Sequence, residues 1–147
     1  MSIEIQNRQR RVVGFNTAAL RQRAQLIDEA AHTTDQMVCV TLISDARIHQ
    51  LNHDYRGYDK PTDVLSFAQN EGEYAELNNE ILGDVLISME TAKRQCSKPS
   101  LLDEVTHLLI HGVLHLQGHD HQEDEEAQVM HDEETRIWAA IRSQQSD

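Results

Sequence analysis

The sequence predicts an α+β or α/β domain in which helices flank a small mixed β-sheet. Two observations support this fold class. Segments with a strand-like apolar pattern alternate with segments of helical pattern, and the strand-like segments at about 62–67 and 83–87 follow one another as in a hairpin. At 147 residues the chain is also long enough to bury one core without stabilising disulfides or metals, so we expect residues 1–147 to form a single domain.

The individual elements follow from periodicity and capping residues. Strands are expected where apolar residues alternate or form short β-branched runs, at about residues 3–5, 37–43, 62–67 and 83–87. Helices are expected where apolar residues recur behind a capping Asn, Ser or Asp, at about residues 17–31, 45–56, 89–98, 101–117 and 123–141. The run at 37–43 is typical of a strand buried on both faces. Residues 70–80 are typical of an exposed hairpin connection. The chain is expected to fray from Gln144 onward.

The net charge of −12 at pH 7 weakens the case for a nucleic-acid partner. Its distribution is uneven, because residues 1–60 hold 8 Lys and Arg against 7 Asp and Glu, whereas the remaining residues hold 5 against 18. The acidic runs at 123–126 and 132–134 predict solvated faces. The densest basic cluster, residues 7–11, is either a phosphate-contacting patch or a solvated connection. This charge distribution is therefore compatible with phosphate binding by a local basic patch together with a metal.

The cysteines and the N-terminus bear on the compartment. Cys39 and Cys96 have no motif spacing and are typical of reduced cysteines in a cytosolic protein. No apolar run reaches transmembrane length, and the N-terminal residues lack the pattern of a signal peptide. We therefore expect a cytoplasmic protein without a membrane partner.

The strongest chemical signal is His-Gly-Val-Leu-His-Leu-Gln-Gly-His-Asp-His at 111–121. His111 and His115 are four residues apart, so on a helix they project from one face. Gly118 suits a left-handed helix end, after which His121 can approach the same point. Three neutral imidazoles leave a fourth zinc position open, as in catalytic sites. We predict one Zn²⁺ bound by His111, His115 and His121; the alternative is a His-rich helix whose histidines are ordinary surface or core residues.

The spacing is that of the metzincin protease signature with one difference. Position 112 is Gly, where a zinc peptidase carries the Glu that acts as general base. Other histidines are interpreted differently. His49 and His53 share helical spacing but have no third ligand nearby, so they are expected on the surface. His107, one turn before His111, is interpreted as a hydrogen-bonded neighbour of the site or a core residue.

Together with residues 52–57, 62–67 and 82–88, the histidine motif resembles the YbeY family of bacterial endoribonucleases, over most of residues 50–121. The resemblance implies a four-stranded mixed sheet with the metal helix against it, zinc, and a cytoplasmic location. It also implies single-stranded RNA as substrate and a role at the small ribosomal subunit, in rRNA 3′-end processing and ribosome quality control. By position, His111, His115 and His121 match the zinc ligands, and Arg56 matches the arginine regarded as functional.

One position departs from the family pattern. The family usually has Tyr where this chain has His119, which lies four residues after His115 and is a rival third ligand. Because Gly118 breaks the helix before that spacing applies, His121 is retained as the third ligand.

Arg56 is expected to clamp a phosphate, since its planar fork pairs bidentately with phosphate oxygens. The alternative is a surface ion pair with Asp59 or another acid. Candidate general bases are Asp63, Asp84 and Asp120, each of which also has a structural alternative. The attacking group, water or the RNA 2′-hydroxyl, stays open, as does the oligomeric state.

Three function classes follow. The first is a metal-dependent endoribonuclease, a hydrolase of phosphodiester bonds, because zinc with an open position attracts an anionic phosphodiester and lowers the pKa of water. The second is a zinc hydrolase acting on peptides, which Gly112 disfavours. The third is a ribosome-associated factor with a structural metal, against which the open fourth position argues.

Overall fold

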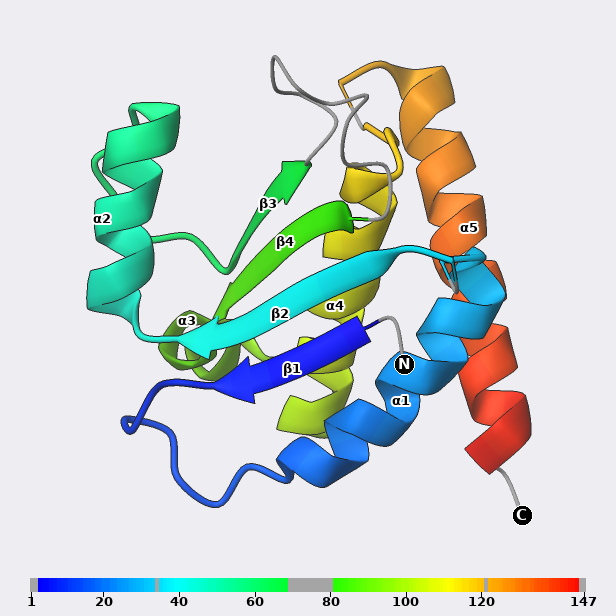
Figure 1. The fold of residues 1–147 in the computed structure, drawn as a ribbon, viewed down its shortest axis with the longest axis horizontal. Coiled ribbons are helices and arrows are strands. Elements are labelled where there is room, and N and C mark those ends of the chain that lie inside the picture. The colour runs from blue at the N-terminus through cyan, green and yellow to red at the C-terminus, as the bar shows by residue number, and fades with distance from the viewer. Residues whose placement is uncertain (1–2, 34, 69–80, 121, 146–147) are drawn as a thin grey trace.

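The computed structural model describes residues 3–33, 35–68, 81–120 and 122–145. Within them, four strands form one mixed sheet in the order β1-β2-β4-β3 (Figure 1). The strands are β1 (Ile3–Asn7), β2 (Met37–Ile43), β3 (Val64–Ala68) and β4 (Ile81–Ser88). β1 and β4 both run parallel to β2, whereas β3 is antiparallel to β4. The predicted four-stranded mixed sheet and antiparallel pair are thus confirmed; the expected connection at 70–80 lies outside the described residues.

The helices begin where the sequence places capping residues. They are α1 (Thr17–Ala31), α2 (Asp45–Arg56), α3 (Met89–Gln95), α4 (Leu101–Leu116) and α5 (Asp124–Gln145). The first four each begin after a cap whose side chain accepts a backbone N–H three residues later: Asn16, Ser44, Ser88 and Ser100. α5 continues beyond the predicted end at Ile141, where the Arg142 guanidinium lies 4.9 Å from the Trp138 ring. None of the helices in the described ranges has both the length and the apolarity needed to span a bilayer.

α4 lies against one face of the sheet, with α1 and α5 beside it, and α2 covers part of the other face (Figure 1). The prediction that the metal helix is central is confirmed, since most of its apolar residues are fully buried: Val105, Leu109, Ile110, Val113, Leu114 and Leu116. The prediction that β2 is buried on both faces is wrong. Its residues Cys39 and Thr41 are half-buried, because α2 covers the open face only near Ile43 and Leu65.

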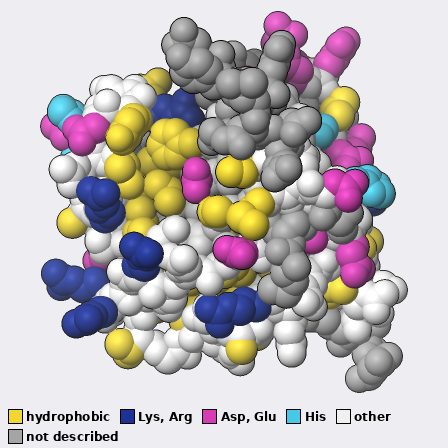
Figure 2. Space-filling model, in the orientation of Figure 1, with side chains coloured by type: hydrophobic (Ala, Val, Ile, Leu, Met, Phe, Trp, Pro, Cys, Tyr) yellow, Lys and Arg dark blue, Asp and Glu magenta, His cyan; other side chains and the backbone are white. Residues whose placement is uncertain are grey.

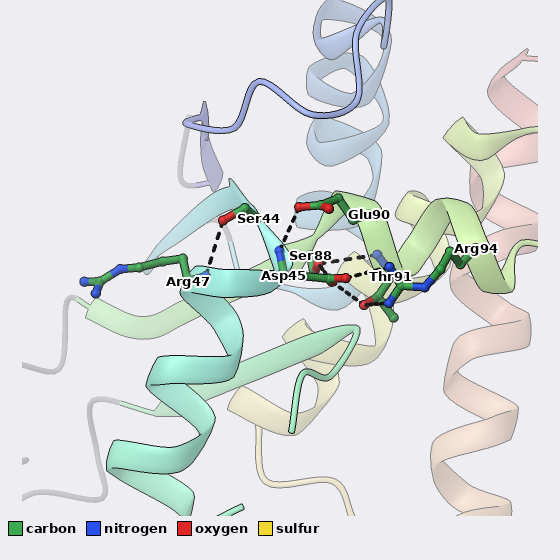
Figure 3. Close-up of polar contacts among 7 residues, drawn as sticks. All are labelled: Ser44, Asp45, Arg47, Ser88, Glu90, Thr91 and Arg94. Carbon is green, nitrogen blue, oxygen red and sulfur yellow. Dashed lines mark hydrogen bonds and ion pairs between the residues drawn. The ribbon is translucent and has the colours of Figure 1, made fainter. Parts of the chain in front are cut away.

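Asp45 joins the first turns of α2 and α3 at the carboxyl edge of the sheet (Figure 3). Its Oδ1 accepts hydrogen bonds from the Ser88 and Thr91 hydroxyls, both at 2.5 Å, and its Oδ2 accepts one from Arg94 at 2.6 Å. In return, the Asp45 backbone N–H donates to Glu90 Oε1 at 3.1 Å. Burial alone would raise the pKa of Asp45, but these hydrogen bonds and the Arg94 charge lower it overall. The ionised carboxylate therefore connects two helices that follow neighbouring parallel strands.

Replacing this carboxylate should weaken the fold in a pH-dependent way. Asp45→Asn is expected to lower the free energy of unfolding at pH 7 by about 2 kcal/mol, since an amide supports fewer of the hydrogen bonds. Because the folded-state pKa lies below the ordinary value of 3.8, the difference is complete above that pH and shrinks as pH falls through the folded-state pKa. Urea unfolding at several pH values measures it. Asp54→Asn, at an exposed pair with His53, is the control and should change little. A difference that grows on acidification would contradict this role.

Candidate metal centre and cleft

α4 approaches the sheet most closely at Gly112. A Cβ at this position would lie 2.6 Å from Val85 Cγ1 and 3.1 Å from Val85 Cγ2. The Ser66 hydroxyl donates a hydrogen bond to the Gly112 carbonyl at 3.2 Å, which fixes the helix to β3 as well. The glycine that replaces the peptidase base in the sequence is therefore also a packing requirement, and a glutamate would not fit here without moving the helix.

α4 ends in a Schellman motif. Gly118 has a φ of 95°, its N–H donates to the His115 carbonyl at 3.0 Å, and the His119 N–H donates to the Leu114 carbonyl at 3.0 Å. Gly118 thus turns the chain as the sequence predicts. Because the helix ends at Leu116, the helical spacing that would place His119 over His115 does not extend to it.

His111 and His115 meet through their outer nitrogens. Their Nε2 atoms are 2.9 Å apart, and the ring centroids are 4.5 Å apart. Two ligands of a tetrahedral zinc, each about 2.0–2.1 Å from the metal, are separated by roughly 3.3 Å, so a small outward movement of either ring admits the ion. The chemistry and convergence of this pair fit zinc. The third predicted ligand, His121, lies outside the described residues, and the described ranges contain no group of three His, Cys, Asp or Glu arranged to hold a metal.

Glu134 on α5 contacts the other side of the His111 ring. Its Oε1 lies 3.1 Å from His111 Nδ1. Burial alone would raise the pKa of Glu134, but the hydrogen bond from His111 and the neighbouring His107 and His131 lower it overall. The ionised carboxylate can accept but not donate, so His111 Nδ1 carries the hydrogen and its Nε2 presents a lone pair.

Both histidines open into a cleft of about 810 Å³ bounded by the end of α2, β3 and the end of α4. Its wall includes Arg56, Lys60, Asp63, His111, His115 and Asp120. The structure therefore brings the predicted arginine and two predicted metal ligands to one cavity, although 55 positions separate Arg56 from His111.

The Arg56 side chain is exposed but anchored. It donates to the Ser66 carbonyl at 2.6 Å, and its guanidinium carbon lies 5.1 Å from the Phe67 ring centre. The alternative ion pair with Asp59 is absent from the described residues, where Asp59 instead binds His49 Nε2 at 2.7 Å. Arg56 thus lines the cleft with its guanidinium held against β3.

Comparison with known proteins identifies relatives over most of the chain. The sequence model described as "Endoribonuclease YbeY" matches residues 3–142. Curated relatives with the same name include those of Geobacter sulfurreducens, 37% identical with 97% of each chain covered, and Pelotomaculum thermopropionicum, 43% identical over 85% of this chain and 86% of the relative.

The chain belongs to the YbeY family. The solution structure of TM1509 from Thermotoga maritima has a similar fold, with a TM-score of 0.61 at 25% identity over 98% of this chain and 91% of that one. The predicted family resemblance and fold class are confirmed.

The candidate bases of this YbeY-family chain separate into two groups. Asp63 and Asp120 line the cleft, although Asp63 also accepts a hydrogen bond from Gln95 at 2.7 Å. Asp84 is not among the cleft residues that the structure describes; it lies on β4 beside Cys39 of β2, and burial raises the pKa of its carboxyl. Geometry therefore favours Asp63 and Asp120 over Asp84.

The remaining histidines lie where their spacing indicates. His49 and His53 pair with Asp59 and Asp54 at the surface of α2. His107 is half-buried one turn before the site, its ring 6.4 Å from that of His111, and burial lowers its pKa.

Sequence reasoning missed Glu134, which contacts His111, and two residues that line the cleft, Tyr58 and Lys60. The prediction that residues 132–134 form a solvated acidic face is wrong for Glu134, whose side chain is 15% exposed. The signal that could have identified it is its place four residues after Met130 and three before Ile137, both buried.

The contact at Gly112 can be tested by a double-mutant cycle. Gly112→Ala should lower the free energy of unfolding by about 1–2 kcal/mol, because overpacking outweighs the roughly 1 kcal/mol that Ala gains in helix propensity. In a Val85→Ala background the added methyl has room, so the same change should cost markedly less. Urea unfolding of the four proteins measures the coupling; additive effects would contradict the packing role.

Proposed function

We propose that this chain is a zinc-dependent endoribonuclease that cleaves single-stranded RNA in the cytoplasm. We further propose that it acts at the small ribosomal subunit, in rRNA 3′-end maturation and ribosome quality control. The observation that carries the proposal is the convergence of His111 Nε2 and His115 Nε2, 2.9 Å apart, in a cleft that also exposes Arg56. The activity in the relatives' shared name, endoribonuclease, fits this arrangement.

In this proposal His111, His115 and His121 hold one zinc ion. When bound, zinc supplies a Lewis acid beside the phosphodiester and makes water a better nucleophile at neutral pH. The chain's own contribution is the orientation of the imidazoles. α4 fixes two of them by helical spacing, and the Schellman turn at Gly118 ends the helix and bonds the His119 N–H to the Leu114 carbonyl.

Arg56 is suited to bind the non-bridging oxygens of the scissile phosphate. Its hydrogen bond to the Ser66 carbonyl and its position over Phe67 limit the directions that the guanidinium can take. A fixed guanidinium stabilises charge that develops on phosphate without reorganising during the reaction.

The same cleft has features suited to a single strand of RNA. Tyr58 is 59% exposed and lines the cleft, with Lys60 Nζ 5.7 Å from its ring centre. Aromatic faces and cations together bind unpaired bases and backbone phosphates. On the face in Figure 2, most Lys and Arg side chains lie on the left and lower side, whereas acidic side chains lie at the upper right and also at the left and centre. The cleft cations Arg56 and Lys60 favour an RNA path along the end of α2, away from the acidic first turn of α5.

Cleavage assays with matched substrates test the metal and the reaction class. Labelled single-stranded RNA should be cut by the zinc-loaded protein, casein should remain intact, and chelation should abolish RNA cleavage. His115→Ala should lose stoichiometric zinc and activity because one of three imidazoles is removed. His119→Ala is the control and should keep its zinc. Casein cleavage without RNA cleavage, or zinc binding without either activity, would contradict the proposal, and retained zinc in His115→Ala would overturn the ligand set.

Arg56 can be tested separately from metal binding. Arg56→Ala should lower kcat/KM on single-stranded RNA by about 100-fold to 1000-fold with zinc content unchanged, because a transition-state contact is lost. Arg56→Lys should recover part of the rate, since a point charge replaces the planar fork. Arg47→Ala removes a cation at the opposite end of α2 and should have little effect. Equal losses in Arg47→Ala and Arg56→Ala would indicate general electrostatics instead of a phosphate clamp.

A further inference from the structure

Glu134 occupies a position where the pattern of α5 calls for an apolar residue. Met130, Ile137 and Ile141 form the buried stripe of this helix, and each is at most 2% exposed. Glu134 follows Met130 by four positions and precedes Ile137 by three, so it lies within that stripe, and its side chain is 15% exposed. A carboxylate that is largely removed from water destabilises the fold by several kcal/mol unless it is paired. Packing alone therefore does not explain a glutamate here.

The contact that Glu134 makes points to its role. Its Oε1 is 3.1 Å from His111 Nδ1, while His111 Nε2, on the far side of the ring, is 2.9 Å from His115 Nε2. We propose that Glu134 is a positioning residue for the metal centre. It holds the hydrogen of His111 on Nδ1 and so leaves the Nε2 lone pair directed at the point that His115 shares. This inference rests on the proposed function, because it takes zinc as the ion that His111 and His115 bind.

This arrangement adds α5 to a site that the sequence motif places entirely within residues 111–121. A carboxylate that accepts a hydrogen bond from the non-coordinating ring nitrogen of a histidine ligand orients that ring and makes it more basic. Removal of such a carboxylate weakens metal affinity by about 10-fold to 100-fold. Glu133, next in the chain, offers a contrast. Its carboxylate binds Arg136 at 2.7 Å, and its side chain is 34% exposed.

The test compares Glu134→Leu, Glu134→Gln and Glu133→Gln in the full-length protein. Zinc affinity is measured by competition with a chelator, without reference to RNA cleavage. The tautomer of His111 in metal-free protein is read by NMR correlation of the ring nitrogens at about pH 8, where ordinary imidazoles are neutral. Urea unfolding of the metal-free proteins reports on the fold.

Glu134→Leu should bind zinc about 10-fold to 100-fold more weakly and shift His111 toward the Nε2–H tautomer, while metal-free stability stays equal or rises. Glu134→Gln keeps a neutral acceptor, so it should retain the tautomer and lose about threefold to tenfold in affinity. Glu133→Gln should match the unaltered protein in both measurements.

The outcomes separate this inference from the proposed function. Unchanged tautomer and affinity in Glu134→Leu would overturn the positioning role. If Glu134→Leu shifts the His111 tautomer but the unaltered protein does not bind zinc, Glu134 positions His111 and the zinc proposal is refuted. If Glu134→Leu does not fold, Glu134→Gln decides, and an affinity equal to that of the unaltered protein would overturn the inference.

Discussion

The contact between α4 and β4 at Gly112 is the constraint on which the site depends. A Cβ at this position would lie 2.6 Å from Val85 Cγ1, so any residue other than glycine requires Val85 or the helix to shift. The apolar side of α4 is buried in the core, and His111 and His115 lie half-buried along the cleft. Helical spacing supplies the rest, because side chains four positions apart emerge together. The same close packing excludes the acidic side chain that a zinc peptidase would place between them.

Features that depend on neighbouring residues were predictable from the sequence. The capping residues Asn16, Ser44, Ser88 and Ser100 mark helix starts, because each cap bonds the backbone three positions away. The histidine pair and the turn at Gly118 are equally local, and both form as expected. The antiparallel pairing of β3 with β4 followed from the length of the connection between two apolar runs. For the caps, the histidine pair and the turn, the physical cause lies within one or two turns of chain.

Features that depend on tertiary packing were not predictable. Glu134 lies 23 positions from His111 and on a different helix, so the acidic run around it indicates a solvated surface until the helices are placed together. The open face of β2 depends on how far α2 reaches across the sheet, which the apolar run at 37–43 does not encode. Net charge was similarly uninformative, because the cleft gathers Arg56, Lys60, Asp63 and Asp120 from distant parts of the chain, and the total of −12 does not describe this balance.

The account is tested most directly by X-ray absorption at the zinc edge of the purified protein. It predicts one zinc per chain with three imidazole nitrogens at about 2.0–2.1 Å and one further light atom, since the site leaves one position for a non-protein ligand. The imidazole number should fall by one in His121→Ala, whose side chain completes the predicted set. Two or fewer imidazoles in the unaltered protein, sulfur from Cys39 or Cys96, or a spectrum unaffected by loss of His121 would contradict it.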